Sequence, residues 1–177
     1  MEETKESSGW LRRIILLAAV LAVLAVGYLA VHQYCSWKTM RPFMKGTKDG
    51  KWYTFDVADG YEIWARPFST TNFYGEVHVQ KKGANRLNIG SGAENENALA
   101  LFAWRKMSST DFGILISRPT GSGISAYVVL INEFGDYIRE GAFNEEEEAF
   151  ILEFLRENKS EIKYLISLYH SVENEAK

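Results

Sequence analysis

Glu76 and His78 are spaced as residues that could share a metal ion or a proton. Side chains two positions apart in a strand project from the same face, and both types can bind metals and carry protons. A complete metal site needs more ligands, but the other histidines are His32, beside an apolar segment, and His170, near the C-terminus. Because the local pattern puts Glu76 and His78 on the polar face of their strand, we expect both to be solvated and predict no metal site.

The other motifs that could indicate catalysis or cofactor binding give no functional site in this sequence. Residues 121–126, GSGISA, match the letters of a dinucleotide-binding loop, but such a loop opens a helix, whereas residues 127–131, YVVLI, are typical of a strand. We therefore predict a glycine hairpin and no cofactor. No Gly-x-Ser-x-Gly elbow marks a serine nucleophile. Acids such as Asp56 and Glu62 could pair as acid and base only if the fold brings them together, so we assign no catalytic residue.

Aromatic residues are concentrated between positions 52 and 74 and are the best ground for a binding surface. Rings are favoured in strands and build cores, which accounts for most of them. Because strand side chains alternate between two faces, some of these rings must point away from the core. We predict that an exposed pair among Trp52, Tyr61, Trp64 and Tyr74 forms this surface.

The elements that position these residues begin with an apolar segment. Residues 14–31, IILLAAVLAVLAVGYLAV, contain no charge, side-chain amide or proline, and as a helix they would be about 27 Å long, close to the thickness of a bilayer's hydrocarbon core. Trp10 precedes the segment, and Tyr34 and Trp37 follow it, as the aromatic belts of a spanning helix do. We therefore predict a single-pass transmembrane anchor in a lipid bilayer, because a core helix would have a polar side.

Two other interpretations of this segment fit less well. A cleaved signal peptide would have its cleavage site at the small residues 25–27, but the apolar run continues past them. A lipidated Cys35 would need small residues before it, whereas residues 32–34 are bulky or polar. A retained anchor requires neither feature, and we favour it.

Basic residues beside the anchor bear on its orientation. Arg12 and Arg13 touch it on the amino side, although the Lys and Arg of the two flanks nearly balance. A short amino tail is easily retained while a long domain is translocated. We predict a cytoplasmic tail at residues 1–13, a basic juxtamembrane linker at 32–50 and an extracytoplasmic domain at 51–177. In the reverse orientation the linker would meet anionic cytoplasmic lipids, where each charge contributes about 1 kcal/mol.

Composition limits what the domain can be. The net charge is −3, but residues 36–132 carry twelve Lys and Arg against eight Asp and Glu, and residues 133–177 carry five against twelve. The basic excess is too small and scattered to indicate nucleic-acid binding. Cys35 is the only cysteine, which excludes a disulfide within the domain, a thiolate nucleophile and a cysteine-based metal site.

The first part of the domain is predicted to consist of short strands. Alternating patterns place them at residues 51–57, 61–66, 73–80, 86–89, 112–117 and 124–131. Asp59-Gly60 predicts a hairpin turn, and residues 91–97 a polar loop. Residues 98–106 are compatible with either a helix or a strand.

The C-terminal region is predicted to be helical. Asn144 and Glu147 have the spacing of a capping box, and apolar residues then recur with a helical period as far as Tyr169. Residues 158–160 either break this helix or lie on its solvent-exposed face. The fold class is α+β: an N-terminal transmembrane helix, a mostly antiparallel β-sheet domain, and a C-terminal amphipathic helix packed on the sheet.

Three functions are compatible with this architecture. The anchor, the aromatic strands and the lack of a catalytic signature favour a protein-binding accessory, assembly or inhibitor factor at the membrane surface, with another membrane or envelope protein as its partner. A membrane-tethered hydrolase using carboxylates is the alternative, and would show two close carboxylates in a concave pocket. A sugar- or lipid-binding module would show exposed coplanar rings or an open apolar cavity.

Overall fold

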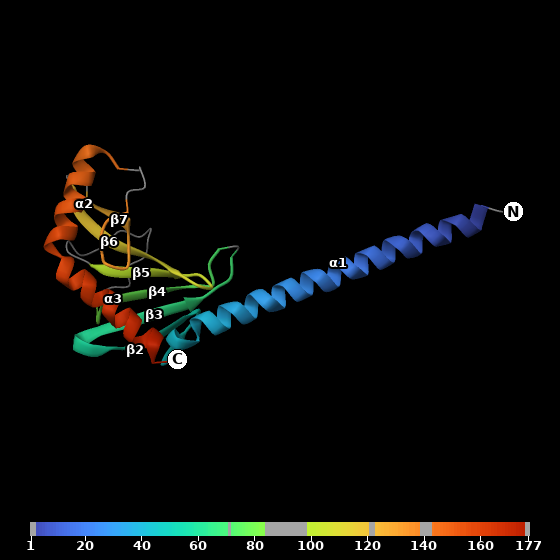
Figure 1. Cartoon of the computed structure of the whole chain (residues 1–177), viewed down its shortest axis with the longest axis horizontal. Helices are drawn as coiled ribbons and strands as arrows, with labels where there is room; N and C mark the ends of the chain where they lie inside the picture. Colours follow the sequence, from blue (N-terminus) through green and yellow to red (C-terminus); the bar gives the residue numbers. More distant parts are fainter. Residues whose placement is uncertain (1–2, 71, 84–98, 121–122, 139–142, 176–177) are drawn as a thin grey trace. The chain divides into compact units, whose positions relative to one another are not determined.

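A computed structural model describes residues 3–70, 72–83, 99–120, 123–138 and 143–175. The chain divides into two compact units, Met1–Cys35 and Ser36–Lys177. Figure 1 shows a long N-terminal helix, a sheet and C-terminal helices, so the predicted α+β class is confirmed. The strand that we predicted at residues 86–89 and the loop at 91–97 lie outside the described residues.

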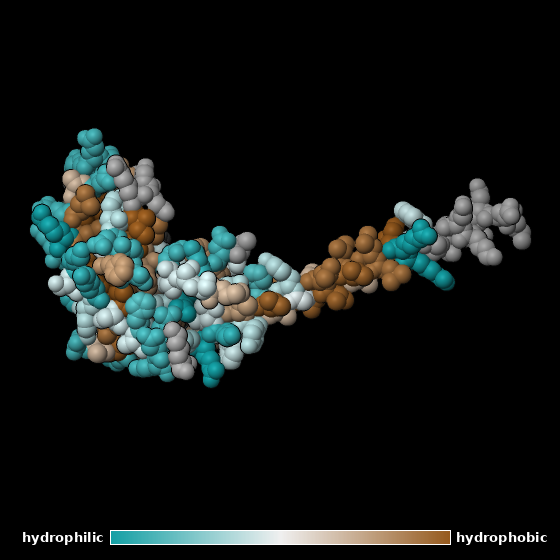
Figure 2. Space-filling view, in the orientation of Figure 1, coloured by the Kyte–Doolittle hydropathy of each residue, from teal (hydrophilic) through white to brown (hydrophobic). Residues whose placement is uncertain are grey.

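Helix α1 (Glu3–Met40) carries the apolar segment. It is the one helix of the described residues that is long and apolar enough to cross a membrane. Its most apolar stretch is wholly exposed, unlike the buried helix of a globular core, and forms the brown band of Figure 2. The exposed residues include Trp10, Arg12 and Arg13 at one end of the segment and Tyr34 and Trp37 at the other.

Within the described part of the chain, seven strands form one antiparallel sheet in chain order. They are β1 (Thr47–Asp49), β2 (Trp52–Asp56), β3 (Tyr61–Pro67), β4 (Gly75–Lys81), β5 (Ala100–Arg105), β6 (Thr110–Thr120) and β7 (Gly123–Ile131). The turn between β2 and β3 is the short helix η2 (Ala58–Gly60), in which Asp59 (φ 57°) and Gly60 (φ 78°) take the left-handed conformation that these residue types tolerate. The predicted Asp59-Gly60 hairpin is therefore confirmed.

The structure also decides two ambiguous segments. Of these residues the structure describes 99–106, which contain strand β5 and no helix. Leu101 and Ala103 face one side of the sheet, while Phe102 faces the other. Gly123 pairs with Thr120 and opens strand β7, as the predicted glycine hairpin requires. Gly123 and the eight residues after it thus form a strand, at the place where a dinucleotide-binding loop would open a helix.

Two helices, α2 (Glu145–Glu157) and α3 (Lys159–Asn174), cover one face of the sheet (Figure 1). The predicted capping box begins α2: the Glu147 amide donates to Asn144 Oδ1 over 2.9 Å, and the Asn144 amide donates to Glu147 Oε2 over 3.1 Å. The single predicted helix is broken at Asn158, whose side-chain amide donates to the Phe154 carbonyl. Both helices bury apolar residues against the sheet, among them Ile151, Leu155, Ile162, Leu165 and Tyr169.

The second unit begins earlier than the predicted domain. The Ser36 hydroxyl donates to the Tyr74 carbonyl over 2.7 Å and lies 3.2 Å from the Phe68 carbonyl, while Met40 and Phe43 are fully buried. Part of the stretch that we expected to be a linker, residues 32–50, is therefore core, helix η1 (Arg41–Phe43) and strand β1. The three buried residues Ser36, Met40 and Phe43 are four and then three positions apart, which is the spacing of a helix face packed on a surface.

Candidate functional site

The face of the sheet opposite α2 and α3 carries an unusual set of aromatic and charged side chains. We call this set the tryptophan face: Trp52, Trp64, Arg66, Glu76, His78, Phe102 and Trp104. Directly opposed residues of antiparallel strands share a face, and the register opposes Trp64 to His78 and His78 to Phe102. In the same way Arg66 is opposed to Glu76, and Glu76 to Trp104.

The rings of this face form a continuous row across four strands. The His78 ring lies 4.0 Å from the Phe102 ring and 4.9 Å from the Trp52 ring, measured between centroids. Trp52 is 6.4 Å from Trp64 at an edge-on angle, and Phe102 is 6.0 Å from Trp104. Phe102 also belongs to a small apolar cluster with Ala100 and Leu115. This face is consequently not the polar surface that strand alternation predicted.

Arg66 organises the charges beside these rings. Its Nη2 lies 2.8 Å from Glu76 Oε1, and its guanidinium sits 5.0 Å from the centre of the Trp52 ring. The Glu76 oxygen is also 3.9 Å from His78 Nε2. An arginine that stacks on a ring and pairs with a carboxylate is held in one conformation, ready to contact a ligand at low entropic cost.

The prediction that Glu76 and His78 are solvated is wrong. His78 is only 5% exposed, and the side chain of Glu76 is 12% exposed. The physical reason is that His78 lies between the large rings of Trp52 and Phe102, which belong to neighbouring strands and shield it. Among the described residues, no three His, Cys, Asp or Glu side chains are grouped so that they could hold a metal ion.

The four aromatic residues predicted to supply an exposed pair are separated by the fold. Trp52 and Trp64 lie together on the tryptophan face, where Trp52 is buried and Trp64 half-buried. Tyr61 points to the opposite, helix-covered face of the sheet. Tyr74 is half-buried and lies in the connection between β3 and β4, directly before β4 begins. None of the four is fully exposed. Trp104 was missed because the strand register of β5 was not recognised.

Tyr61 is part of the attachment of α3 to the sheet. Its hydroxyl donates to Glu161 Oε1 over 2.9 Å, and its ring meets that of Tyr164 edge-on at 5.6 Å. The pKa of Tyr61 is raised to about 12, mainly because burial disfavours the charged form and secondly because the hydroxyl donates a hydrogen bond to Glu161. This residue holds the core together and is not available to a ligand.

Asp56 and Glu62, the acids that we considered as a pair, are directly opposed across β2 and β3. Each has a different partner: Lys82 Nζ lies 2.5 Å from Asp56 Oδ2, and Gln80 Nε2 donates to Glu62 Oε1 over 3.0 Å. Asp56 is exposed, and neither acid lines the pocket described below. The two acids are thus opposed across the strand pair, and each is paired with its own basic or amide side chain.

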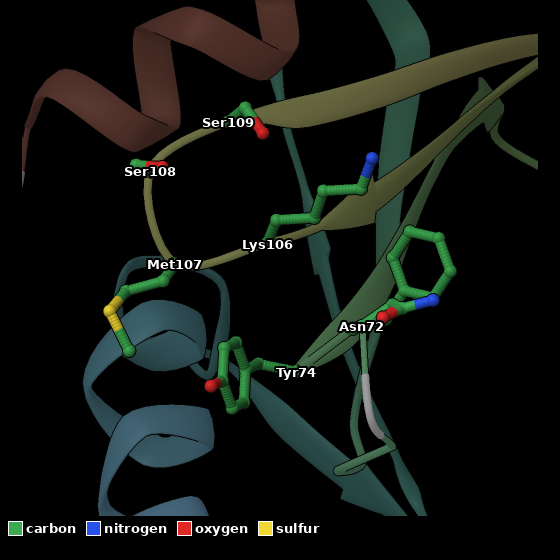
Figure 3. Close-up of a pocket in the computed structure, with 7 residues that line it drawn as sticks. Asn72, Tyr74, Lys106, Met107, Ser108 and Ser109 are labelled. Carbon is green, nitrogen blue, oxygen red and sulfur yellow. The ribbon is translucent and has the colours of Figure 1, made fainter.

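A pocket of about 540 Å³ lies at one end of the sheet. Its lining comes from the β3–β4 connection (Asn72, Phe73, Tyr74) and the β5–β6 turn (Lys106, Met107, Ser108, Ser109), as Figure 3 shows. The Tyr74 amide donates to the Arg105 carbonyl over 2.8 Å and so joins the two segments. Lys106 Nζ is 5.3 Å from the Phe73 ring and 2.5 Å from Asp111 Oδ2. The lining contains hydroxyls, an amide and an ammonium group, but no carboxylate.

Arg105 connects the C-terminal end of α3 to the end of α1. It donates to the Tyr169 hydroxyl over 2.5 Å, to the Glu173 carboxylate, and to the Thr39 carbonyl over 3.3 Å. Burial alone would raise the pKa of Glu173, but the hydrogen bond and charge of Arg105 outweigh it and hold that pKa below its ordinary value. Because both side chains are largely buried, this pair stabilises the fold and offers nothing to a ligand.

No known protein family matches the chain, and neither a characterised protein nor a solved structure is similar to it.

Proposed function

We propose that this chain is a single-pass membrane protein whose domain Ser36–Lys177 binds another membrane or envelope protein at the extracytoplasmic surface. In this role it serves as an accessory, assembly or inhibitor factor. The tryptophan face is the proposed contact surface.

The close attachment of the domain to the apolar segment supports action at the membrane surface. The segment ends at Val31, and Ser36 is already hydrogen-bonded within the domain. The five chain steps between them can extend over about 18 Å at most. A domain held so near a bilayer meets membrane proteins far more often than it meets free soluble partners.

The single observation that carries the binding role is the composition of the tryptophan face. Trp and Arg dominate the energetic centres of protein interfaces, since they combine a large apolar area with a directed polar group. Here Trp64, Trp104 and Arg66 all keep part of their surface exposed while neighbouring rings and Glu76 fix their conformations. The lining of the pocket at the end of the sheet, by contrast, contains no carboxylate of the kind that a carboxylate hydrolase would use.

Photo-crosslinking in native membranes tests this proposal. A photoreactive phenylalanine analogue replaces Trp64 in one full-length protein and Leu152 in a matched control, since Leu152 is an exposed apolar residue of α2 on the opposite layer. We expect one discrete adduct with a membrane protein from position 64 and none from position 152. The Trp104→Ala change should weaken that adduct.

Two results would contradict the proposal. Identical adducts from both positions would show that the tryptophan face is not the contact surface. Extraction of the full chain from membranes by alkaline carbonate would show that α1 does not span the bilayer.

A further inference from the structure

We propose that the end of the sheet that carries the pocket docks on the bilayer and receives the phosphate of an anionic lipid headgroup there. We call this end the docking loops: residues 68–70 and 72–74 between β3 and β4, and residues 106–109 between β5 and β6. Residue 71 lies outside the described residues. This inference concerns a surface other than the tryptophan face, and it rests on the proposed membrane span.

The attachment of Ser36 places the docking loops near the membrane. Its hydroxyl bonds directly to a docking-loop carbonyl, that of Tyr74. With at most about 18 Å of chain between Val31 and Ser36, and about 5–8 Å of headgroups beyond the hydrocarbon core, the loops stay within reach of lipid phosphates. The limit comes from chain length alone and holds for any tilt of the apolar segment.

The tip of the β5–β6 turn has the character of a membrane-contacting loop. Met107 is 66% exposed although it is apolar, and it is followed by the exposed Ser108 and Ser109. One exposed methionine is ordinary on a protein surface. This turn, however, cannot move far from the lipid headgroups. The flexible side chain of Met107 can therefore be buried among the lipids, while the hydroxyls of Ser108 and Ser109 stay in contact with water and phosphate.

The polar groups around the pocket match a phosphate. Lys106 supplies an ammonium group, and the side chains of Asn72, Ser108 and Ser109 supply uncharged donors. The present partner of Lys106 is Asp111, in a half-exposed pair that water weakens and a phosphate can replace. The ammonium group of Lys106 would attract the phosphate by its charge, and the uncharged groups would donate hydrogen bonds to the phosphate oxygens, without a metal ion.

Two more cations lie next to the attachment point. Lys38 and Arg41 follow Ser36 closely in the chain, and both are exposed. Near an anionic lipid surface each Lys or Arg contributes about 1 kcal/mol, which corresponds to about fivefold in a binding equilibrium per charge. Together with Lys106 they give this end of the domain a preference for anionic over neutral lipids.

The full chain in lipid nanodiscs provides the test. In a Cys35→Ser background, single cysteines at Met107 and at Ala58 are labelled with a polarity-sensitive fluorophore, and quenching by headgroup spin-labelled lipid is measured. Ala58 is the matched control because it is exposed and lies in η2, at the other end of β3, about 20 Å away along the strand. We expect several-fold stronger quenching at position 107 than at position 58.

Lipid charge and a second variant make the test specific. The quenching at position 107 should be greater in discs of equal parts phosphatidylcholine and phosphatidylglycerol than in phosphatidylcholine alone. Changing both Lys106 and Lys38 to Gln should reduce this difference, of which Arg41 retains a part, and neither substitution touches the buried core. Equal quenching at positions 107 and 58 would overturn the docking, and no effect of lipid charge would overturn the phosphate assignment.

The test also separates this inference from the proposed function. A chain that fails to enter nanodiscs contradicts the membrane span itself. A chain that enters the discs but leaves Met107 unquenched contradicts only the docking of the loops.

Discussion

Replacing Gly75 with alanine should destabilise the domain through one residue, Met40. A Cβ atom at Gly75 would lie 2.3 Å from Met40 Sδ, 2.5 Å from its Cγ and 2.7 Å from its Cε. Ordinary contact is about 3.5–4.0 Å, so the methionine would have to move by more than about 1 Å. Because Met40 is fully buried, that movement displaces other core atoms, and we expect Gly75→Ala to cost about 1–3 kcal/mol.

The decisive measurement is the same substitution without the methionine. Met40→Ala alone should cost about 2–5 kcal/mol through the cavity that it leaves. In that background the new Cβ has space, and the backbone at Gly75 is not in the left-handed region, so Gly75→Ala should be neutral or stabilise by up to about 1 kcal/mol. The two changes should therefore be coupled by about 1–4 kcal/mol.

Urea unfolding of the full chain in non-ionic detergent would supply these values. Tryptophan fluorescence reports on the sheet, to which Trp52, Trp64 and Trp104 belong. Met107→Ala is the control, because it removes an exposed methionine and should change the free energy of unfolding by less than about 0.5 kcal/mol. An equal cost of Gly75→Ala with and without Met40 would refute the packing of the α1 end on the sheet.

Two further predictions concern the helices. Glu173→Gln should cost about 2 kcal/mol near pH 7, because it removes the negative charge that pairs with the guanidinium of Arg105. The cost is less than the roughly 3–5 kcal/mol of a fully buried pair, because both side chains keep some exposure and the glutamine oxygen can still accept a hydrogen bond. The pKa of Glu173 is lowered in the folded state, so its contribution to the free energy of unfolding is present above the ordinary carboxyl pKa and is lost as the pH falls through the lowered value. The urea midpoint should therefore drop less on acidification in the Glu173→Gln variant than in the unchanged protein. Asn144→Ala should cost about 1 kcal/mol by removing the acceptor for the Glu147 amide, and faster amide exchange confined to the first turn of α2 would identify the lost cap.

Much of the fold could be predicted because its signals are local. The Asn144 capping box, the Asp59-Gly60 turn and the apolar run of α1 are each decided by the residues of one continuous segment of the chain. The glycine hairpin before β7 was distinguished from a nucleotide loop by the residues that follow it. Strand β5 stayed ambiguous because its alanines and leucines suit a helix as well as a strand, and only pairing with β4 and β6 decides between them.

The candidate sites depended on contacts between distant segments. Strand alternation correctly put Glu76 and His78 on one face, but nothing near them in the chain indicated that Trp52 and Phe102 would flank them. The same applies to Arg105, which has partners in α1 and α3 that lie more than sixty positions away.

The amino-acid order alone therefore determined the apolar helix, the α+β class, the capped start of α2 and the Asp59-Gly60 turn, since these follow from periodicity and from backbone preferences. Tertiary structure decided that the domain begins at Ser36, that the second face of the sheet is aromatic, and that two loops meet at the attachment point. The reason is physical: burial and charge pairing depend on which strands become neighbours. The free energy that selects those neighbours is distributed over the whole core.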